Sequence, residues 1–189
     1  MAMKSEISLA NNLLIAMPTL ADPNFSRTVT LLCEHSDEGA MGIMINRPTN
    51  LVLRDILAQL NIDAGSSPHA NAVVYFGGPV QNSRGFVLHE PVGNWEATLA
   101  VTDSLGVSTS RDILEAIARD QGPDRYLVAL GYAGWDAGQL ERELSENSWL
   151  NVPAQREILF TLPVDQRWRA AAQLTGVDLT HLSSEAGHA

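Results

Sequence analysis

The chain has almost no lysine, a single cysteine and no long hydrophobic run. Its 189 residues contain 12 basic and 22 acidic side chains, which gives a formal net charge of −10, and Lys4 is the only lysine. A surface of this sign repels phosphate backbones and anionic lipid, which disfavours direct nucleic-acid binding and membrane binding. No apolar run approaches the roughly 20 residues of a membrane span. The lone Cys33 excludes an internal disulfide, and we expect a cytoplasmic protein.

The composition favours one folded domain over residues 1–189. Apolar residues make up 45% of the chain, enough for one sizeable core. No repeat, low-complexity segment or interdomain linker interrupts it. We expect only the tail, from about residue 178, to be frayed.

Hydrophobic patterning predicts strands and helices in a definite order. Seven short apolar or alternating runs bounded by Pro, Gly, Asn or Asp predict strands: Leu13–Met17, Thr28–Cys33, Met41–Asn46, Val73–Phe76, Gly85–His89, Ala97–Val101 and Tyr126–Leu130. Four helices are predicted: one with Leu53, Ile56, Leu57 and Leu60 after the caps Thr49 or Asn50; one opened by a Thr109–Asp112 capping box; one capped by Asp136; and one from Pro163 to Gly176 that buries Val164, Trp168 and Ala171.

This order indicates an α+β fold. Strands joined by short connections favour antiparallel hairpins, and single strands between helices favour some parallel pairing. A further strand between the last two helices fits the same scheme. We therefore expect a single-domain α/β sandwich with a large mixed, mostly antiparallel sheet covered by about four or more helices.

Familiar catalytic and cofactor motifs are absent from the sequence. The only lysine, Lys4, has no phosphate-binding loop around it, and Gly131, Gly134 and Gly138 lack the dinucleotide-binding spacing. The segment 106–110 ends in Ser where a hydrolase elbow needs Gly. His35, His89, Glu34 and Glu90 lack the short spacing of metal ligands. We expect no cofactor, no metal and no recognised catalytic residue.

Cys33 and His35 form the one pair to weigh as a nucleophile. Residues two apart on a strand share a face, so the imidazole could stabilise a thiolate. The alternative, which we favour, is a buried structural thiol beside a histidine that bonds a loop. Cys33 is thus a redox candidate only.

The sequence gives only weak support to the hypothesis of a helix-turn-helix motif at the C-terminus. Ala172, Gly176 and Leu182 have its spacing, but the proposed recognition helix, Asp178–Ala186, contains no Arg or Lys to contact bases and phosphates. A helix end followed by a terminal turn explains the segment better.

Five motifs contain more glycine, proline, arginine and tryptophan than core packing alone requires. They are DPNFSRTV (22–29), GAMGIMINRP (39–48), FGGPV (76–80), RGFVLH (84–89) and GYAGWDAGQLERELSENSWL (131–150). Arg27, Arg47 and Arg84 stand beside their turns and could clamp an anion or, as we favour, bond loop carbonyls and Asp22. Trp135 and Trp149 are candidates for interface anchors or for core packing.

Together with LLIAMP, these motifs resemble the AlgH/YqgE family of bacterial proteins, in the family's order and over nearly the whole chain. The resemblance implies an α/β sandwich on a large mixed sheet. It also implies a label as a transcriptional regulator, without a demonstrated reaction, cofactor or DNA site.

Two hypotheses follow for function. The first, which we favour, is a non-enzymatic interaction or regulatory protein that acts on transcription indirectly and binds a protein partner or small ligand in a shallow cleft; we favour a monomer. The second is an enzyme acting on a small anionic substrate through Arg47, Arg84, His35, His89 and Cys33. The candidate cleft residues are Asn24, Phe25, Arg27, His35, Asn46, Arg47, Pro48, Gly77, Gly78, Pro79, Arg84, Gly85, Tyr132, Trp135 and Gln139.

Overall fold

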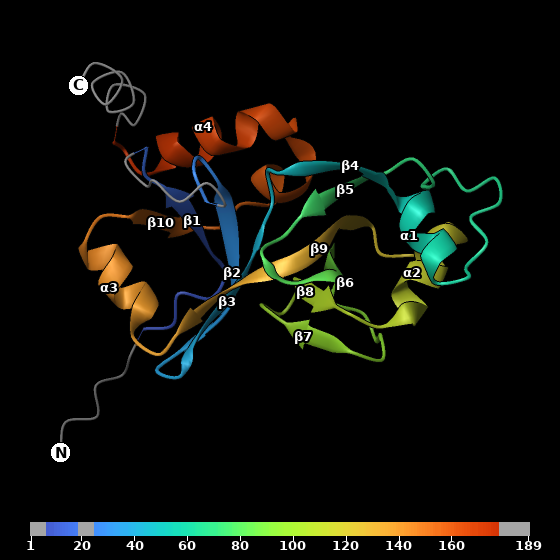
Figure 1. Cartoon of the computed structure of the whole chain (residues 1–189), viewed down its shortest axis with the longest axis horizontal. Helices are drawn as coiled ribbons and strands as arrows, with labels where there is room; N and C mark the ends of the chain where they lie inside the picture. Colours follow the sequence, from blue (N-terminus) through green and yellow to red (C-terminus); the bar gives the residue numbers. More distant parts are fainter. Residues whose placement is uncertain (1–6, 19–24, 178–189) are drawn as a thin grey trace.

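The chain builds one large curled sheet with helices around it (Figure 1). The computed structural model describes residues 7–18 and 25–177. Its strands are β1 (Asn12–Ala16), β2 (Val29–Ser36), β3 (Gly39–Met44), β4 (Pro48–Val52), β5 (Val73–Phe76), β6 (Val80–Glu90), β7 (Thr98–Ala100), β8 (Gly106–Ser108), β9 (Arg125–Asp136) and β10 (Trp149–Pro153). The main strand order is β10-β1-β2-β3-β9-β6-β8-β7, with β5 paired to β9 and β4 to β5. Among these pairs only β5 and β9 run parallel, so the sheet is mixed and mostly antiparallel.

The long strand β9 joins the two halves of the sheet. Its first half pairs with β5 and β6, and Ala133–Asp136 pairs with β3. Between the halves, Gly131 has a φ of +77°. Only glycine adopts this left-handed conformation readily, so Gly131 lets the strand change direction without strain.

Four α-helices and one π-helix lie around the sheet in the described part of the chain: α1 (Leu53–Gln59), α2 (Arg111–Ala118), α3 (Gln139–Ser145), η1 (Glu157–Thr161) and α4 (Val164–Leu174). In Figure 1, α1 and α2 lie at one end, α3 at the other, and α4 along one side. Within the described residues, 7–18 and 25–177, no helix is both long and apolar enough to cross a membrane.

Three clusters of buried apolar side chains hold these elements together. The largest includes Leu13, Leu31 and Ile43 of the sheet and Ala171 of α4. A second packs α1 and α2 on β5, β6 and β9, and a third surrounds Trp135 and Trp149. In each cluster, most of the buried apolar side chains come from strands and helices that the apolar spacing of the sequence predicted.

The seven predicted strands and four predicted helices are present, with several corrected ends. Strands β6 and β9 are longer than the runs that predicted them. Strands β4 and β8 were not predicted, because both are short and begin with Pro or Gly. The expected further strand is β10. The tail from residue 178 lies outside the described residues.

The predicted helix caps were wrong because other partners use those side chains. Thr49 lies in β4, where its hydroxyl donates to the Val74 carbonyl at 2.7 Å. Asn50 lies in the same strand, and α1 begins only at Leu53. The α2 cap is Ser110, and Asp112 accepts the Glu96 N–H at 2.9 Å.

The cap predicted for α3 is also corrected. Asp136 ends β9, and α3 begins after Gly138. The side-chain oxygen of Gln139 accepts the Asp136 N–H at 3.0 Å, so Asp136 receives a contact from the helix instead of capping it.

Candidate functional site

An open cavity of about 900 Å³ lies between the β2–β3 hairpin, the end of β9 and β7. We call it the acidic groove. Its lining comprises Ser8, Ala10, Cys33, Glu34, His35, Ser36, Glu38, Gly39, Ala40, Met41, Val80, Leu99, Ala100, Val101, Tyr132, Gly134, Trp135 and Asp136. The hairpin and β9 meet here because β3 pairs with β9 from Gly39 to Gly42.

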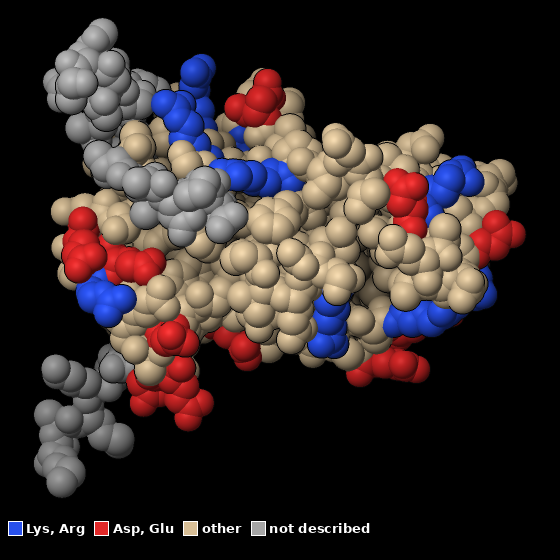
Figure 2. Space-filling view, viewed as in Figure 1, with Lys and Arg blue, Asp and Glu red and all other residues tan. Residues whose placement is uncertain are grey.

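The groove combines negative charge with apolar surface. Three exposed carboxylates line it, those of Glu34, Glu38 and Asp136, and none of the described residues in its lining is Lys or Arg. Figure 2 shows acidic side chains gathered around α3 and the end of the β2–β3 hairpin. The groove therefore suits a ligand with positive charge and some apolar surface.

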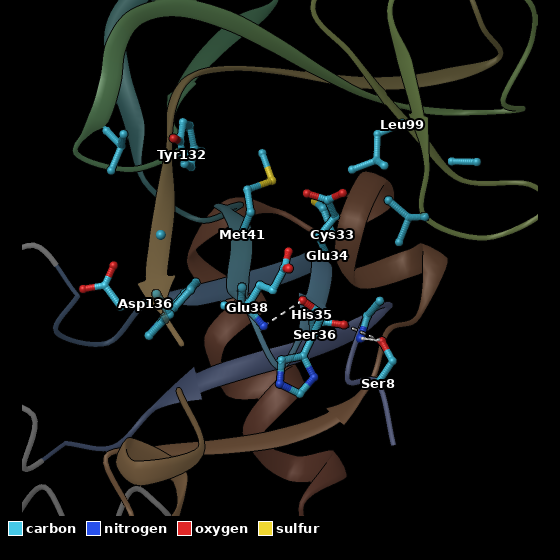
Figure 3. Close-up of a pocket in the computed structure, with 18 residues that line it drawn as sticks. Ser8, Cys33, Glu34, His35, Ser36, Glu38, Met41, Leu99, Tyr132 and Asp136 are labelled. Atoms are coloured by element: carbon cyan, nitrogen blue, oxygen red, sulfur yellow. Dashed lines mark hydrogen bonds between the residues drawn. The ribbon is translucent and has the colours of Figure 1, made fainter. Parts of the chain in front are cut away.

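The apolar wall is formed by side chains from three strands. Met41, Leu99 and Tyr132 lie around the opening in the close-up (Figure 3). All three are half-buried and pack against the main core, so the sheet holds them in place. Such residues can contact a ligand without a large cost in ordering.

His35 is held as a structural residue at one end of the groove. Its Nδ1 accepts the Leu9 N–H at 2.9 Å, and its Nε2 donates to the Glu141 carboxylate. This hydrogen bond lowers the pKa of Glu141. In Figure 3 the His35 ring points away from Tyr132 and Leu99. Its two nitrogens bond protein groups and not the space of the groove.

Cys33 lacks the surroundings of a reactive thiol. Its side chain is buried, and its thiol donates to the Leu31 carbonyl at 3.6 Å. Burial, and then the charge of Glu34, raise the pKa of the thiol to about 12. A neutral thiol is a poor nucleophile, so this environment opposes redox chemistry at Cys33.

Phe25, Trp135 and Trp149 form an aromatic cluster beside the groove. The two indoles meet edge to face at 5.9 Å between ring centroids, and Phe25 lies 5.6 Å from Trp149. Glu143 of α3 accepts both indole N–H groups, at 3.2 and 3.1 Å. Gln139 donates to the other oxygen of Glu143 at 3.1 Å, so this candidate residue serves to orient the carboxylate.

Another group of candidates fixes the turn before β2. Asn46 accepts the Val29 N–H at 2.9 Å and donates to the Arg27 carbonyl at 3.0 Å. Arg47 donates to the Ser26 carbonyl at 2.7 Å, and the Arg27 guanidinium lies 5.6 Å from the centre of the Trp168 ring. These contacts agree with the structural role that the sequence favoured. Asn24 and Asp22 lie outside the described residues.

The remaining candidates lie away from the groove lining. Gly77, Gly78 and Pro79 connect β5 to β6 against the backbone of β9. Pro48 begins β4 opposite Tyr75, and Gly85 lies in β6. The Arg84 guanidinium donates to the Thr109 hydroxyl at 3.2 Å and lies 5.9 Å from the centre of the Phe86 ring.

The residues proposed for anionic-substrate chemistry do not share this groove. Of the five, only Cys33 and His35 line it. His89 is fully buried, donates from Nδ1 to the Pro91 carbonyl at 2.9 Å, and accepts the Ser108 hydroxyl at Nε2 at 2.7 Å. Burial lowers the pKa of His89, with the Pro91 bond opposing that shift, so the neutral ring is stabilised. Across the described residues, no cluster of three or more His, Cys, Asp or Glu side chains could hold a metal ion.

The sequence analysis missed the residues that give the groove its character. The candidate cleft residues did not include Glu34, Glu38, Asp136, Met41 or Leu99. Their signal was a cluster of acidic residues at a strand–turn–strand segment and another carboxylate at the end of a long apolar run. Neither signal shows that the two segments are adjacent in space.

The curled sheet, the bent β9 and the open groove define an α+β protein with an acidic cavity on one side of its sheet. The chain belongs to the AlgH-like family, whose model matches residues 13–180. This confirms the resemblance drawn from the motifs.

Individual relatives extend over almost the full chain. A UPF0301 protein of Methylococcus capsulatus is 55% identical over 95% of this chain and 96% of its own length, and one of Thioalkalivibrio sulfidiphilus is 54% identical over 99% and 100%. The solution structure of the AlgH protein from Pseudomonas aeruginosa is 50% identical, covers 100% of both chains and has a TM-score of 0.81. A crystal structure from Corynebacterium diphtheriae, 20% identical over 96% of this chain and 94% of its own, has a TM-score of 0.71 and shares the fold.

Proposed function

We propose that this protein is a non-enzymatic interaction protein whose acidic groove binds an extended, basic segment of a protein partner. The observation that carries the proposal is a groove whose described lining has three exposed carboxylates and no Lys or Arg, bordered by an edge strand. A regulatory role acts through this protein contact, since a net charge of −10 opposes contact with DNA.

The edge strand β7 supports an extended partner over a small amine. β7 ends the strand order, and Leu99, Ala100 and Val101 line the groove beside it. The Thr109 N–H donates to the Ala97 carbonyl, and the Val101 N–H donates to the Leu105 carbonyl. In an antiparallel pair, every second residue directs its N–H toward the neighbouring strand. The N–H of Ala100, which precedes Val101, therefore points away from β8. An extended peptide can pair with this edge while its basic side chains face the carboxylates.

Calorimetric titration with a short peptide that alternates arginine and leucine tests the charge recognition. Combined Glu34→Gln, Glu38→Gln and Asp136→Asn changes should weaken binding about tenfold, because each screened charge pair contributes roughly 0.2–1 kcal/mol. The charge-matched control combines Glu146→Gln, Glu157→Gln and Asp165→Asn, three exposed acids outside the groove. Equal losses in both variants would mean non-specific attraction and would refute the proposal.

A second variant tests strand pairing. Ala100→Pro removes an N–H that points away from β8, so the fold should tolerate it as edge strands tolerate proline. Peptide affinity should fall while the melting temperature stays close to that of the parent protein. Unchanged affinity in a folded Ala100→Pro protein would exclude pairing with β7.

A further inference from the structure

A second cavity, of about 220 Å³, lies between β5, β9, η1 and α4. It is separate from the acidic groove and shares no lining residue with it. Its wall comprises Ala72, Val73, Tyr75, Tyr126, Leu127, Val128, Leu159, Phe160 and Arg167. Arg167 is the only charged residue among the described residues of that wall.

Arg167 is buried and its charge has no acidic partner in the described structure. Only 5% of the residue is exposed. Its Nε donates to the Leu162 carbonyl at 3.1 Å and its Nη1 to the Ile45 carbonyl. The guanidinium also lies 5.2 Å from the centre of the Tyr75 ring.

The ion pairs within residues 7–18 and 25–177 all join other side chains. Arginine stays protonated in proteins and has five N–H donors, of which the two carbonyls engage two. A buried charge is costly unless an opposite charge or a full set of hydrogen bonds compensates it. The cavity beside Arg167 is where a compensating anion can enter.

The rest of the wall decides which anion fits. Tyr75, Phe160 and Leu159 offer aromatic and aliphatic surface, and a π-helix, a conformation frequent at functional sites, supplies the last two. A single guanidinium among apolar walls suits a ligand that has one negative charge and is otherwise apolar. The volume of about 220 Å³ equals that of roughly seven water molecules, which suits a small ligand.

We propose that this cavity binds the carboxylate of a small apolar organic acid, with Arg167 as its counter-charge and Tyr75 and Phe160 against its apolar part. Planar carboxylates match the guanidinium fork, and a multiply charged phosphate would leave charge uncompensated against the apolar walls. The site is independent of the acidic groove, so either proposal can fail alone.

Titration of the full chain with benzoate, followed by amide chemical shifts, tests the site. We expect saturable shifts around Tyr75, Phe160 and Arg167, and at least tenfold weaker binding of benzamide, which has the same shape without the charge. Inorganic phosphate should not compete. Equal binding of benzamide, displacement by phosphate, shifts confined to other regions, or no binding of benzoate or isobutyrate would each overturn the proposal.

Paired variants separate binding from folding. Val73 and Val177 are 44% and 45% exposed, and only Val73 lines the cavity. Val73→Phe should fill the cavity and weaken benzoate binding at least tenfold, whereas Val177→Phe should leave it unchanged. In a folded Arg167→Gln protein, the preference for benzoate over benzamide should disappear. Retention of that preference would show that Arg167 is not the counter-charge.

Discussion

Replacing Gly78 with alanine tests whether the FGGPV motif is a packing element or part of a binding site. A Cβ atom on Gly78 would lie 2.0 Å from the carbonyl carbon of Tyr132, 2.2 Å from its oxygen and 2.3 Å from the nitrogen of Ala133. All three atoms belong to the main chain of β9, which cannot rotate away as a side chain can. The two backbones would therefore have to separate by roughly 1.5 Å to reach an ordinary contact.

That separation would break bonds that connect the two halves of the sheet. The N–H of neighbouring Gly77 donates to the Leu130 carbonyl at 2.8 Å, and the Gly77 carbonyl accepts the Met44 N–H at 2.9 Å. Overpacking costs about 1–3 kcal/mol, and each weakened hydrogen bond adds about 1 kcal/mol. We expect Gly78→Ala to lower the free energy of unfolding by about 3–5 kcal/mol and the melting temperature by roughly 6–20 °C.

Gly85→Ala is the matched control, since no atom lies within 4 Å of its Cβ position and its φ is not left-handed. It should stay within about 1 kcal/mol of the parent protein, because alanine mainly restricts the unfolded chain. Calorimetric melting of both proteins measures the difference. A Gly78→Ala protein that melts with the parent, or a Gly85→Ala protein that loses as much, would refute the packing role.

Much of the fold could be predicted because its elements have strong local patterns. Leu13–Met17 and Thr28–Cys33 are apolar runs, and both became buried strands. The helix after Leu53 showed its apolar stripe in the sequence. By contrast, β8 has only three residues, Gly106–Ser108, and is a strand because β6 and β7 pair with it on either side. A segment that short has no periodicity of its own.

The candidate sites depend on contacts between distant segments, which patterning does not encode. Nothing local indicates that Glu143 accepts two indole N–H groups, because that requires β9, α3 and β10 to meet. Arg167 is different, since it lies three residues after Val164 and four before Ala171, on the stripe predicted to be buried. A charge on the apolar face of a helix was a readable signal of a buried cation.

Two further predictions concern the carboxylates of α3. Glu143→Ala removes the acceptor shared by the two indole N–H groups, so unfolding should become about 2–3 kcal/mol easier and tryptophan fluorescence should shift to longer wavelength. Exposed Glu146→Ala is its control, and equal losses in melting temperature would contradict the shared-acceptor role. For Glu141, the hydrogen bond from His35 lowers the pKa of the carboxyl below its ordinary 4.5. A depressed pKa in the folded state means that the carboxylate stabilises the fold above pH 4.5 and that this contribution disappears as the pH falls through the folded-state pKa. Because the Glu141 side chain is 48% exposed, the screened pair contributes only about 0.2–1 kcal/mol. Melting curves of Glu141→Gln and the parent protein should therefore differ at neutral pH and converge in acid, whereas a gap that stays constant with pH would show that ionisation of Glu141 contributes nothing to stability.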